Sequence, residues 1–304
     1  MARAADFAVR TQALTKRYRD VGALVDLDLE VAAGEVIGYL GPNGAGKTTT
    51  IRLLLGLIRP SSGHAEIFGM DCHRHPVEAH RRVAVVPGDA NLWPELTGAE
   101  TLHLLGQVHG AVDEAYRDEL IGRFQLDPTK KVRAYSRGTR QKVLLIGALM
   151  SRADLLLLDE PTSGLDPLME QAFRVSVGEA RERGQTVFLS SHVLSEVEAL
   201  CDRVAILRQG RLVESGSLSE MRHLSAVTVE ATVAGDMPDL EGVAGLSSVT
   251  VEGKALRCQV QGPIEPLLEV LMKSGVASLL IREPSLEELF LALYGQNSYH
   301  AEER

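Results

Sequence analysis

Short apolar runs alternate with helical patterns over the first two hundred residues of the chain. Val36–Leu40 and Leu155–Leu158 are continuous apolar runs of the length expected for buried strands. Gln185–Ser190 is predicted to be a third buried strand. A segment with helical spacing, Lys47–Leu57, follows the first run after a glycine-rich loop. This alternation predicts an α/β fold, with a mixed sheet at its core covered by helices.

Two further changes of pattern divide the chain. From about residue 88 to 152 the apolar positions recur at near-helical spacing, so we predict a helical subdomain inserted into the sheet domain. The pattern changes again near Ser215-Gly216. We therefore predict a first domain over residues 1–215 and an accessory domain over residues 216–304.

The accessory domain is predicted to be a small α+β unit. Alternating apolar and polar residues over Val227–Val233 predict a strand, and two more strands flank Glu252-Gly253. A helix over Ile264–Met272, a strand over Leu279–Ile281 and a last amphipathic helix over Leu286–Tyr294 complete the pattern.

The composition is that of a globular protein in a reducing compartment. Of the 304 residues, 45% are hydrophobic and 24% are charged, which excludes disordered and fibrous chains. The formal net charge of -9 argues against a general nucleic-acid binder, which needs clustered Lys and Arg, so we expect no nucleic-acid partner. Three widely spaced cysteines, Cys72, Cys201 and Cys258, cannot form a paired disulfide framework.

No segment of the sequence is apolar enough to span a membrane. A spanning helix needs about 18 uninterrupted apolar residues, and the best runs, such as Val143–Met150, are far shorter. The first residues, Met1–Asp6, contain charges and lack the apolar stretch of a secretory signal. We therefore expect a soluble chain, in which any membrane role comes through another chain.

The strongest motif is a glycine-rich loop between the first apolar run and the helix after it. Gly41-Pro42-Asn43-Gly44-Ala45-Gly46-Lys47-Thr48 fits the pattern G-x-x-x-x-G-K-[ST]. Glycines let backbone N–H groups turn toward phosphate oxygens, and the N-terminus of the following helix attracts anions. We predict that Lys47 reaches the β- and γ-phosphates of a nucleotide and that the Thr48 hydroxyl coordinates Mg²⁺.

Two carboxylates follow the second apolar run, at the end of a strand where open α/β sheets bind their ligands. We predict that Asp159 holds Mg²⁺ through a water molecule. Glu160, the next residue, points to the other face of the strand and is the predicted general base that polarises the attacking water.

Five motifs of the chain stand in a fixed order. They are Gly41–Thr49, Tyr135–Gln141, Leu155–Glu160, Ser163–Asp166 and Ser190-Ser191-His192. In type and order they resemble Walker A, the signature, Walker B, the D-loop and the switch histidine of the ATP-binding cassette (ABC) transporter family, over about residues 7–215. The resemblance implies a P-loop ATPase domain that binds ATP and Mg²⁺.

The family resemblance extends to individual residues. It implies that Tyr18 stacks on the adenine ring, with a place at the rim of the site as the alternative. It also implies that His192 bonds the γ-phosphate and fixes Glu160 and the water, so that Glu160, His192 and Lys47 form the catalytic set. The implied nucleotide-binding residues are Tyr18, Gly41, Pro42, Asn43, Gly44, Ala45, Gly46, Lys47, Thr48, Thr49, Ser136, Gly138 and Asp166.

The signature loop of this family faces the ATP that the opposite subunit holds. Ser136 and the backbone near Gly138 stand at the start of a predicted helix, where anions are attracted. The resemblance therefore implies two ATP molecules between two cassettes. Since this chain has one cassette, we expect a homodimer, or a pair with another ATPase chain.

The chain departs from the family pattern at two places. Arg137 stands where the signature commonly has Gly, and it either adds charge near the γ-phosphate or points to solvent. Gly88 stands where the family has a metal-contacting Gln, and Asp89 is the predicted substitute as Mg²⁺ ligand, beside Thr48 and Asp159. Trp93 is expected to receive the coupling helix of a permease, with a place in the core as the alternative.

The signature segment, the loop around Gly88 and the ending Pro284–Phe290 resemble the ATPase subunits of bacterial antibiotic and multidrug exporters of the daunorubicin-resistance type. The resemblance implies that the chain drives a separate ABC-2 type permease from the cytoplasmic face of the membrane and exports an antibiotic, drug or other hydrophobic compound. It also implies that the accessory domain is ferredoxin-like. The alternatives are a soluble ABC ATPase without a transport role and a nucleotide-binding regulatory module.

Overall fold

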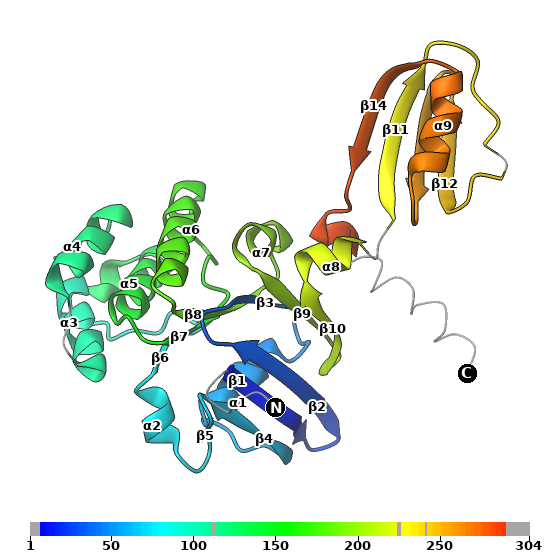
Figure 1. The fold of residues 1–304 in the computed structure, drawn as a ribbon. Coiled ribbons are helices and arrows are strands. Elements are labelled where there is room, and N and C mark those ends of the chain that lie inside the picture. Colours follow the sequence, from blue (N-terminus) through cyan, green and yellow to red (C-terminus); the bar gives the residue numbers. More distant parts are fainter. Residues whose placement is uncertain (1–6, 111–112, 224–225, 241, 290–304) are drawn as a thin grey trace. The chain divides into compact units, whose positions relative to one another are not determined.

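The computed structural model describes residues 7–110, 113–223, 226–240 and 242–289 (Figure 1). The chain divides into two compact units, Met1–Ser215 and Gly216–Arg304. The first unit holds a six-stranded and a four-stranded sheet, and the second holds a further four-stranded sheet. In the described ranges no helix has the length and apolar character needed to cross a membrane.

The six-stranded sheet forms the centre of the first unit. Its strands, in spatial order, are β10 (Arg211–Ser217), β9 (Arg203–Arg208), β3 (Val36–Leu40), β8 (Thr186–Ser191), β7 (Leu155–Asp159) and β6 (Val83–Val86). β3 runs parallel to β8 and β9, and β7 runs parallel to β6 and β8. Every residue of β3, β7 and β8 is buried. This explains the continuous apolar runs Val36–Leu40 and Leu155–Leu158 in the sequence, whereas β8 also buries the polar residues Thr186, Ser190 and Ser191.

An antiparallel sheet lies on one side of this central sheet (Figure 1). Its strand order is β2 (Val21–Ala32), β1 (Phe7–Tyr18), β4 (Ser62–Ile67) and β5 (Met70–Asp71). Helix α1 (Lys47–Leu54) shares a buried apolar core with both sheets. Because a loop of residues 41–46 joins the end of β3 to the start of α1, the N-terminus of α1 is held at the carboxyl edge of the central sheet.

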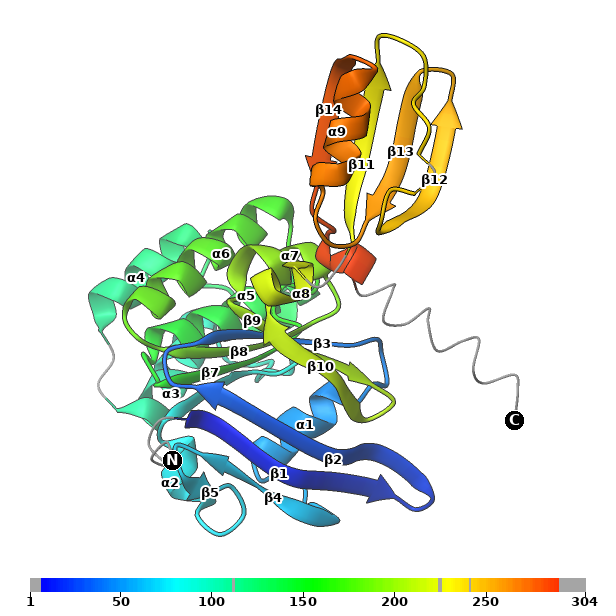
Figure 2. The same ribbon diagram turned by 45° about the vertical axis from the view of Figure 1, so that its right-hand side comes forward.

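Helices cover the other side of the central sheet, where α6 (Pro167–Glu182) and α7 (Leu194–Leu200) contact β8 (Figures 1 and 2). Between β6 and β7 the chain forms α3 (Gly98–His109), α4 (Glu114–Arg123), the short 3-10 helix η1 (Val132–Ala134) and α5 (Arg137–Met150). α5 contacts both α3 and α4, so these helices form one cluster. The predicted α/β fold, with helices inserted into a mixed-sheet core, is confirmed. The short helix α2 (Pro76–His80) precedes β6.

The second unit begins with α8 (Leu218–His223) and contains an antiparallel sheet. The strand order is β12 (Leu246–Glu252), β13 (Ala255–Val260), β11 (Val227–Val233) and β14 (Val276–Arg282). Helix α9 (Glu265–Lys273) buries Leu267 and Leu271 against apolar side chains of β11 and β13. Residues 286–289 are helical, and the rest of the predicted last helix, residues 290–294, lies outside the described residues.

Candidate active site

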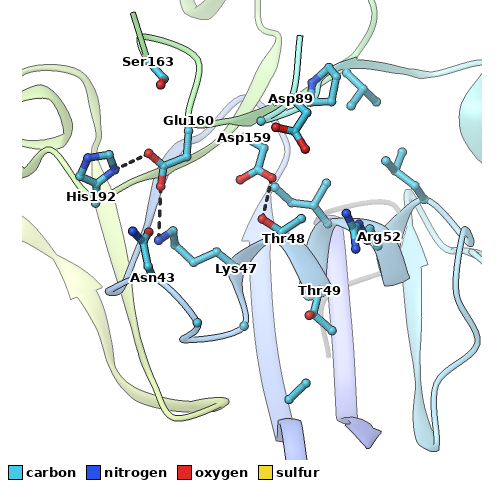
Figure 3. Close-up of a pocket in the computed structure, with 18 of the residues that line it drawn as sticks. Asn43, Lys47, Thr48, Thr49, Arg52, Asp89, Asp159, Glu160, Ser163 and His192 are labelled. Atoms are coloured by element: carbon cyan, nitrogen blue, oxygen red, sulfur yellow. Dashed lines mark hydrogen bonds and ion pairs between the residues drawn. The ribbon is translucent and has the colours of Figure 1, made fainter. Parts of the chain in front are cut away.

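A pocket of about 550 Å³ opens at the carboxyl edge of the central sheet (Figure 3). Four of its wall segments follow β3, β6, β7 and β8, which are parallel strands. Ligands of open α/β sheets bind at this edge because the loops after parallel strands meet there. The walls include Pro42, Asn43, Gly44, Gly46, Lys47, Thr48, Thr49, Pro87, Gly88, Asp89, Arg137, Asp159, Glu160, Ser163 and His192.

The loop before α1 holds a buried lysine at its centre. The side chain of Lys47 is 6% exposed, and its Nζ donates to the carbonyl oxygen of Gly41 at 2.6 Å. Gly46, with a φ of 113°, lies so close to the carbonyl oxygen of Ala23 that a Cβ would stand 2.6 Å from it. Only glycine fits there. The loop is therefore packed tightly and carries its buried ammonium group at the N-terminus of α1, a position that attracts anions.

A second set of contacts joins α1 to the end of β7. Thr48 Oγ1 donates to Asp159 Oδ2 at 2.8 Å, and the other carboxylate oxygen accepts a hydrogen bond from Ser190. Asp159 is 2% exposed. The hydroxyl and the carboxylate are oxygen donors of the kind that Mg²⁺ prefers, so these residues fit a magnesium ion.

The loop after β6 approaches this carboxylate closely. A Cβ at Gly88 would stand 3.3 Å from Asp159 Oδ2, so the absence of a side chain allows this approach. Asp89, the next residue, lines the same pocket and is exposed (Figure 3). The proposed metal ligands Thr48, Asp159 and Asp89 thus come from three separate elements and line one pocket.

Glu160 lies between a lysine and a histidine (Figure 3). Its Oε1 is 3.4 Å from Lys47 Nζ, and its Oε2 contacts Nδ1 of His192. Its φ is 50°, a left-handed conformation that costs on the order of 1–3 kcal/mol in a residue other than glycine. Backbone bonds hold this turn, from the Glu160 N–H to the Ser190 carbonyl at 3.0 Å and from the Ser163 N–H to the Glu160 carbonyl at 3.1 Å. The neighbouring carboxylates Asp159 and Glu160 therefore have separate partners, as two separate roles would require.

The signature loop starts α5 and contacts the D-loop. The Ser136 hydroxyl accepts from the Thr139 N–H at 3.1 Å and so caps the helix. A Cβ at Gly138 would stand 2.3 Å from the carbonyl oxygen of Gly164, so the two backbones touch. Arg137 donates to Ser163 Oγ at 3.2 Å, and these two side chains line the pocket.

Several residues that the sequence predicted for nucleotide binding do not line this pocket. Gly41 and Ala45 are buried within the loop, while Tyr18, Ser136, Gly138 and Asp166 lie outside the walls. Tyr18 is 46% exposed, with the Lys16 ammonium 5.0 Å from its ring centre. Asp166 caps α6 by accepting from the Met169 N–H at 3.0 Å. The nucleotide roles of these residues stay predictions.

Sequence reasoning missed one wall of the pocket. Arg52, Leu55 and Leu57 line it, and Arg52 follows Thr48 by one helical turn of α1. The i, i+4 spacing that puts Thr48 and Arg52 on one helix face was a usable signal. Leu55, Leu57 and Val85 also line an adjoining apolar groove of about 310 Å³ between α1, β6, α3 and α5.

Comparisons with known proteins agree on one family. The family described as "ABC transporter" matches residues 24–163. The daunorubicin resistance ATP-binding protein DrrA3 of Streptomyces coeruleorubidus is 36% identical over 96% of this chain and 98% of that protein. The bacitracin transport ATP-binding protein BcrA of Bacillus licheniformis is 40% identical over 68% of each chain. A solved structure described as the ATP binding subunit of an ABC transporter superposes with a TM-score of 0.67, at 32% identity over 71% of this chain and 92% of that chain.

Proposed function

Because the chain belongs to the ATP-binding cassette family of ABC transporters, we propose that it hydrolyses ATP to drive transport through a separate membrane permease. The observation that carries the proposal is the position of Glu160. Its carboxylate contacts the buried Lys47 on one side and His192 on the other, in the pocket that the glycine-rich loop lines. A carboxylate so held is placed to take a proton from a water that attacks the γ-phosphate.

The proposed mechanism gives a chemical task to several polar groups of the pocket. The loop N–H groups and Lys47 bind the β- and γ-phosphates, Glu160 accepts the proton of the attacking water, and His192 keeps the Glu160 carboxylate in position. Thr48, Asp159 and Asp89 would hold Mg²⁺, which neutralises phosphate charge when it is bound. A positioned general base contributes on the order of 10²–10⁴-fold to such a rate.

We further propose that the working ATPase is a homodimer. Ser136 and Gly138 stand at the N-terminus of α5 but do not line the pocket of their own chain. A helix N-terminus attracts phosphate, so their position supports a role toward the nucleotide that a second copy holds.

The partner in the membrane is proposed to be an ABC-2 type permease. The daunorubicin, bacitracin and Nod factor proteins among the relatives are named for drug resistance, transport or export, which supports export of an antibiotic, drug or other hydrophobic compound. Trp93 is 49% exposed, so a place in the core is wrong for it, and it is available as an apolar anchor. A docked permease would hold the chain at the cytoplasmic face of the membrane.

ATP turnover by the purified full chain tests the first step. We expect Mg²⁺-dependent hydrolysis and a kcat at least about 100-fold lower in Glu160→Gln, which should still bind nucleotide. Glu114→Gln, on α4 with a side chain 79% exposed, is the matched control and should equal the wild type. A wild type without measurable turnover would refute hydrolysis and favour the regulatory module, and equal turnover in the wild type and Glu160→Gln would remove Glu160 as the general base.

The transport step has its own test. A polytopic permease encoded by the neighbouring reading frame should co-purify with the chain, and Trp93→Ala should weaken that complex. Failure of every such permease to bind a hydrolysing chain would favour an ABC ATPase without a transport role.

A further inference from the structure

A buried carboxylate outside the pocket joins two of the loops that form it. Glu196 lies on α7 and is 3% exposed. Its Oε2 accepts one hydrogen bond from Ser191 Oγ at 3.0 Å and another from Thr162 Oγ1 at 3.2 Å. Ser191 directly precedes His192, and Thr162 directly precedes Ser163 of the D-loop. One carboxylate oxygen therefore bridges the segment Ser190–His192, here called the histidine loop, and the residue that leads into the D-loop.

This bridge acts on both sides of the proposed general base. The Ser191 hydroxyl that donates to Glu196 also accepts from the Val193 N–H at 2.9 Å, so the backbone is held before and after His192. On the other side, Thr162 lies in the turn that the Ser163 N–H closes onto the carbonyl of Glu160. The turn contains the left-handed backbone of Glu160, a conformation that persists only when its surroundings hold it.

Stability alone does not explain a carboxylate at this position. The second oxygen, Oε1, is buried and has no hydrogen-bond partner among the residues that the structure describes. A buried acceptor without a partner destabilises the folded state, and this cost offsets part of what the two hydrogen bonds from Ser191 and Thr162 contribute. Burial raises the pKa of the Glu196 carboxyl, while the hydrogen bonds from Ser191 and Thr162 oppose the shift.

We infer that Glu196 is a positioning residue, which locks the histidine loop to the D-loop and so keeps Glu160 and His192 aligned for hydrolysis. The inference rests on the proposed ATPase function. Glu196 does not line the pocket, so it acts through Ser191 and Thr162 rather than on the nucleotide. Lys47 and its loop are not part of the bridge, and nucleotide binding should therefore not depend on it.

Steady-state ATP hydrolysis by the full-length Glu196→Leu variant tests whether Glu196 keeps Glu160 and His192 aligned. We expect kcat to fall on the order of 10- to 100-fold, the size of effect that a misplaced catalytic group produces. The KM for ATP and the affinity for a fluorescent ATP analogue should change less than about threefold. Glu196→Gln should stay within about threefold of the wild type, because the amide oxygen can accept both hydroxyl protons.

Two further variants separate the bridge from packing. Thr162→Val deletes one donor at constant shape, and its kcat should also fall. The double variant with Glu196→Leu should be no slower than Glu196→Leu alone, because both changes remove the same link. Ser195→Ala, at an exposed position of the same helix, is the matched control. Additive losses in the double variant would contradict the bridge.

Amide hydrogen exchange gives a readout that does not require hydrolysis. In Glu196→Leu the Val193 and Ser163 amides should exchange about tenfold faster than in the wild type, with the melting temperature retained, and in Glu196→Gln they should not. Unchanged kcat and unchanged exchange in Glu196→Leu would overturn the inference. The inference would also be overturned if, in Glu196→Leu and Glu196→Gln alike, the loss of kcat only matched the fraction of protein that is unfolded. If the wild type does not hydrolyse ATP, the proposed function fails, and the exchange pattern alone decides the role of Glu196.

Discussion

The glycine-rich loop and the signature loop both lead into the N-terminus of a helix, α1 and α5, yet of the two only the first lies among the proposed catalytic groups. Lys47 is buried and in contact with Glu160, whose other oxygen contacts His192. Ser136 is exposed, and its hydroxyl caps its own helix. Both loops thus lead into a helix N-terminus. They differ in the side chains that neighbouring strands place beside them.

The difference follows from where each loop lies in the fold. The glycine-rich loop follows β3, whose parallel neighbour β8 is in turn paired with β7, so the ends of β7 and β8 bring Asp159, Glu160 and His192 to the same edge. The signature loop belongs to the inserted helices, and the D-loop is the neighbour that its backbone touches. This position agrees with the proposal that the signature loop acts on a nucleotide held by a second copy. Four substitutions test the difference between the two loops.

Lys47→Ala should have the largest effect. Removing a buried ammonium from the centre of the loop should lower the affinity for MgATP by at least about 100-fold, or about 2.8 kcal/mol. Isothermal titration calorimetry measures this, with Lys130→Ala, whose side chain is 63% exposed, as the control. An affinity within threefold of the wild type would mean that this loop is not the phosphate site.

Ser136→Ala should distinguish the role of the signature loop from that of the glycine-rich loop. Nucleotide affinity of the chain should be unchanged, while kcat should fall about tenfold, because the serine is proposed to act on the nucleotide of the second copy. Loss of the helix cap costs about 1 kcal/mol of stability. Thr97→Ala removes the cap of α3 instead and controls for that cost. It should lower the melting temperature similarly with kcat retained, and equal kcat losses in the two variants would reduce Ser136 to a structural cap.

Asp89→Ala tests the loop after β6. If the carboxylate helps to hold Mg²⁺, the Mg²⁺ concentration that gives half-maximal ATPase activity should rise about fivefold. Activity at saturating Mg²⁺ should recover, since Thr48 and Asp159 remain. A Mg²⁺ titration that superposes on that of the wild type would remove Asp89 from the metal site.

Arg137→Gly should have the smallest effect. The substitution restores the common signature residue and removes one hydrogen bond to Ser163, so kcat should change less than about threefold. Steady-state ATPase assays of the two proteins, side by side, are sufficient. An inactive wild type that Arg137→Gly restores fully would show that this arginine blocks the site.

The fold class followed from the sequence because burial shapes the sequence directly. Strands buried on both faces, such as β3 and β7, favour apolar side chains, and the chain shows them as the unbroken runs Val36–Leu40 and Leu155–Leu158. The boundary of β8 was predicted one residue early, at Gln185 rather than Thr186, because hydrogen bonds decide where a strand begins.

The pocket was only partly predictable. The loop residues from Pro42 to Thr49 could be found by motif, because phosphate binding restricts residue types at fixed spacing. Arg52 and Glu196 belong to no such motif. Glu196 looks like an ordinary polar residue of an amphipathic helix, and only its burial and its two hydroxyl partners distinguish it.

The α/β class and the residue types that can hold a triphosphate follow from local patterns of polarity and spacing, which the order of amino acids contains. Which of those residues meet depends on how the chain folds in three dimensions. Thr48 and Asp159 are 111 residues apart in the chain and form a hydrogen bond, and Glu160 reaches both Lys47 and His192. Such contacts depend on the order in which parallel strands assemble, and short-range pattern does not contain that order.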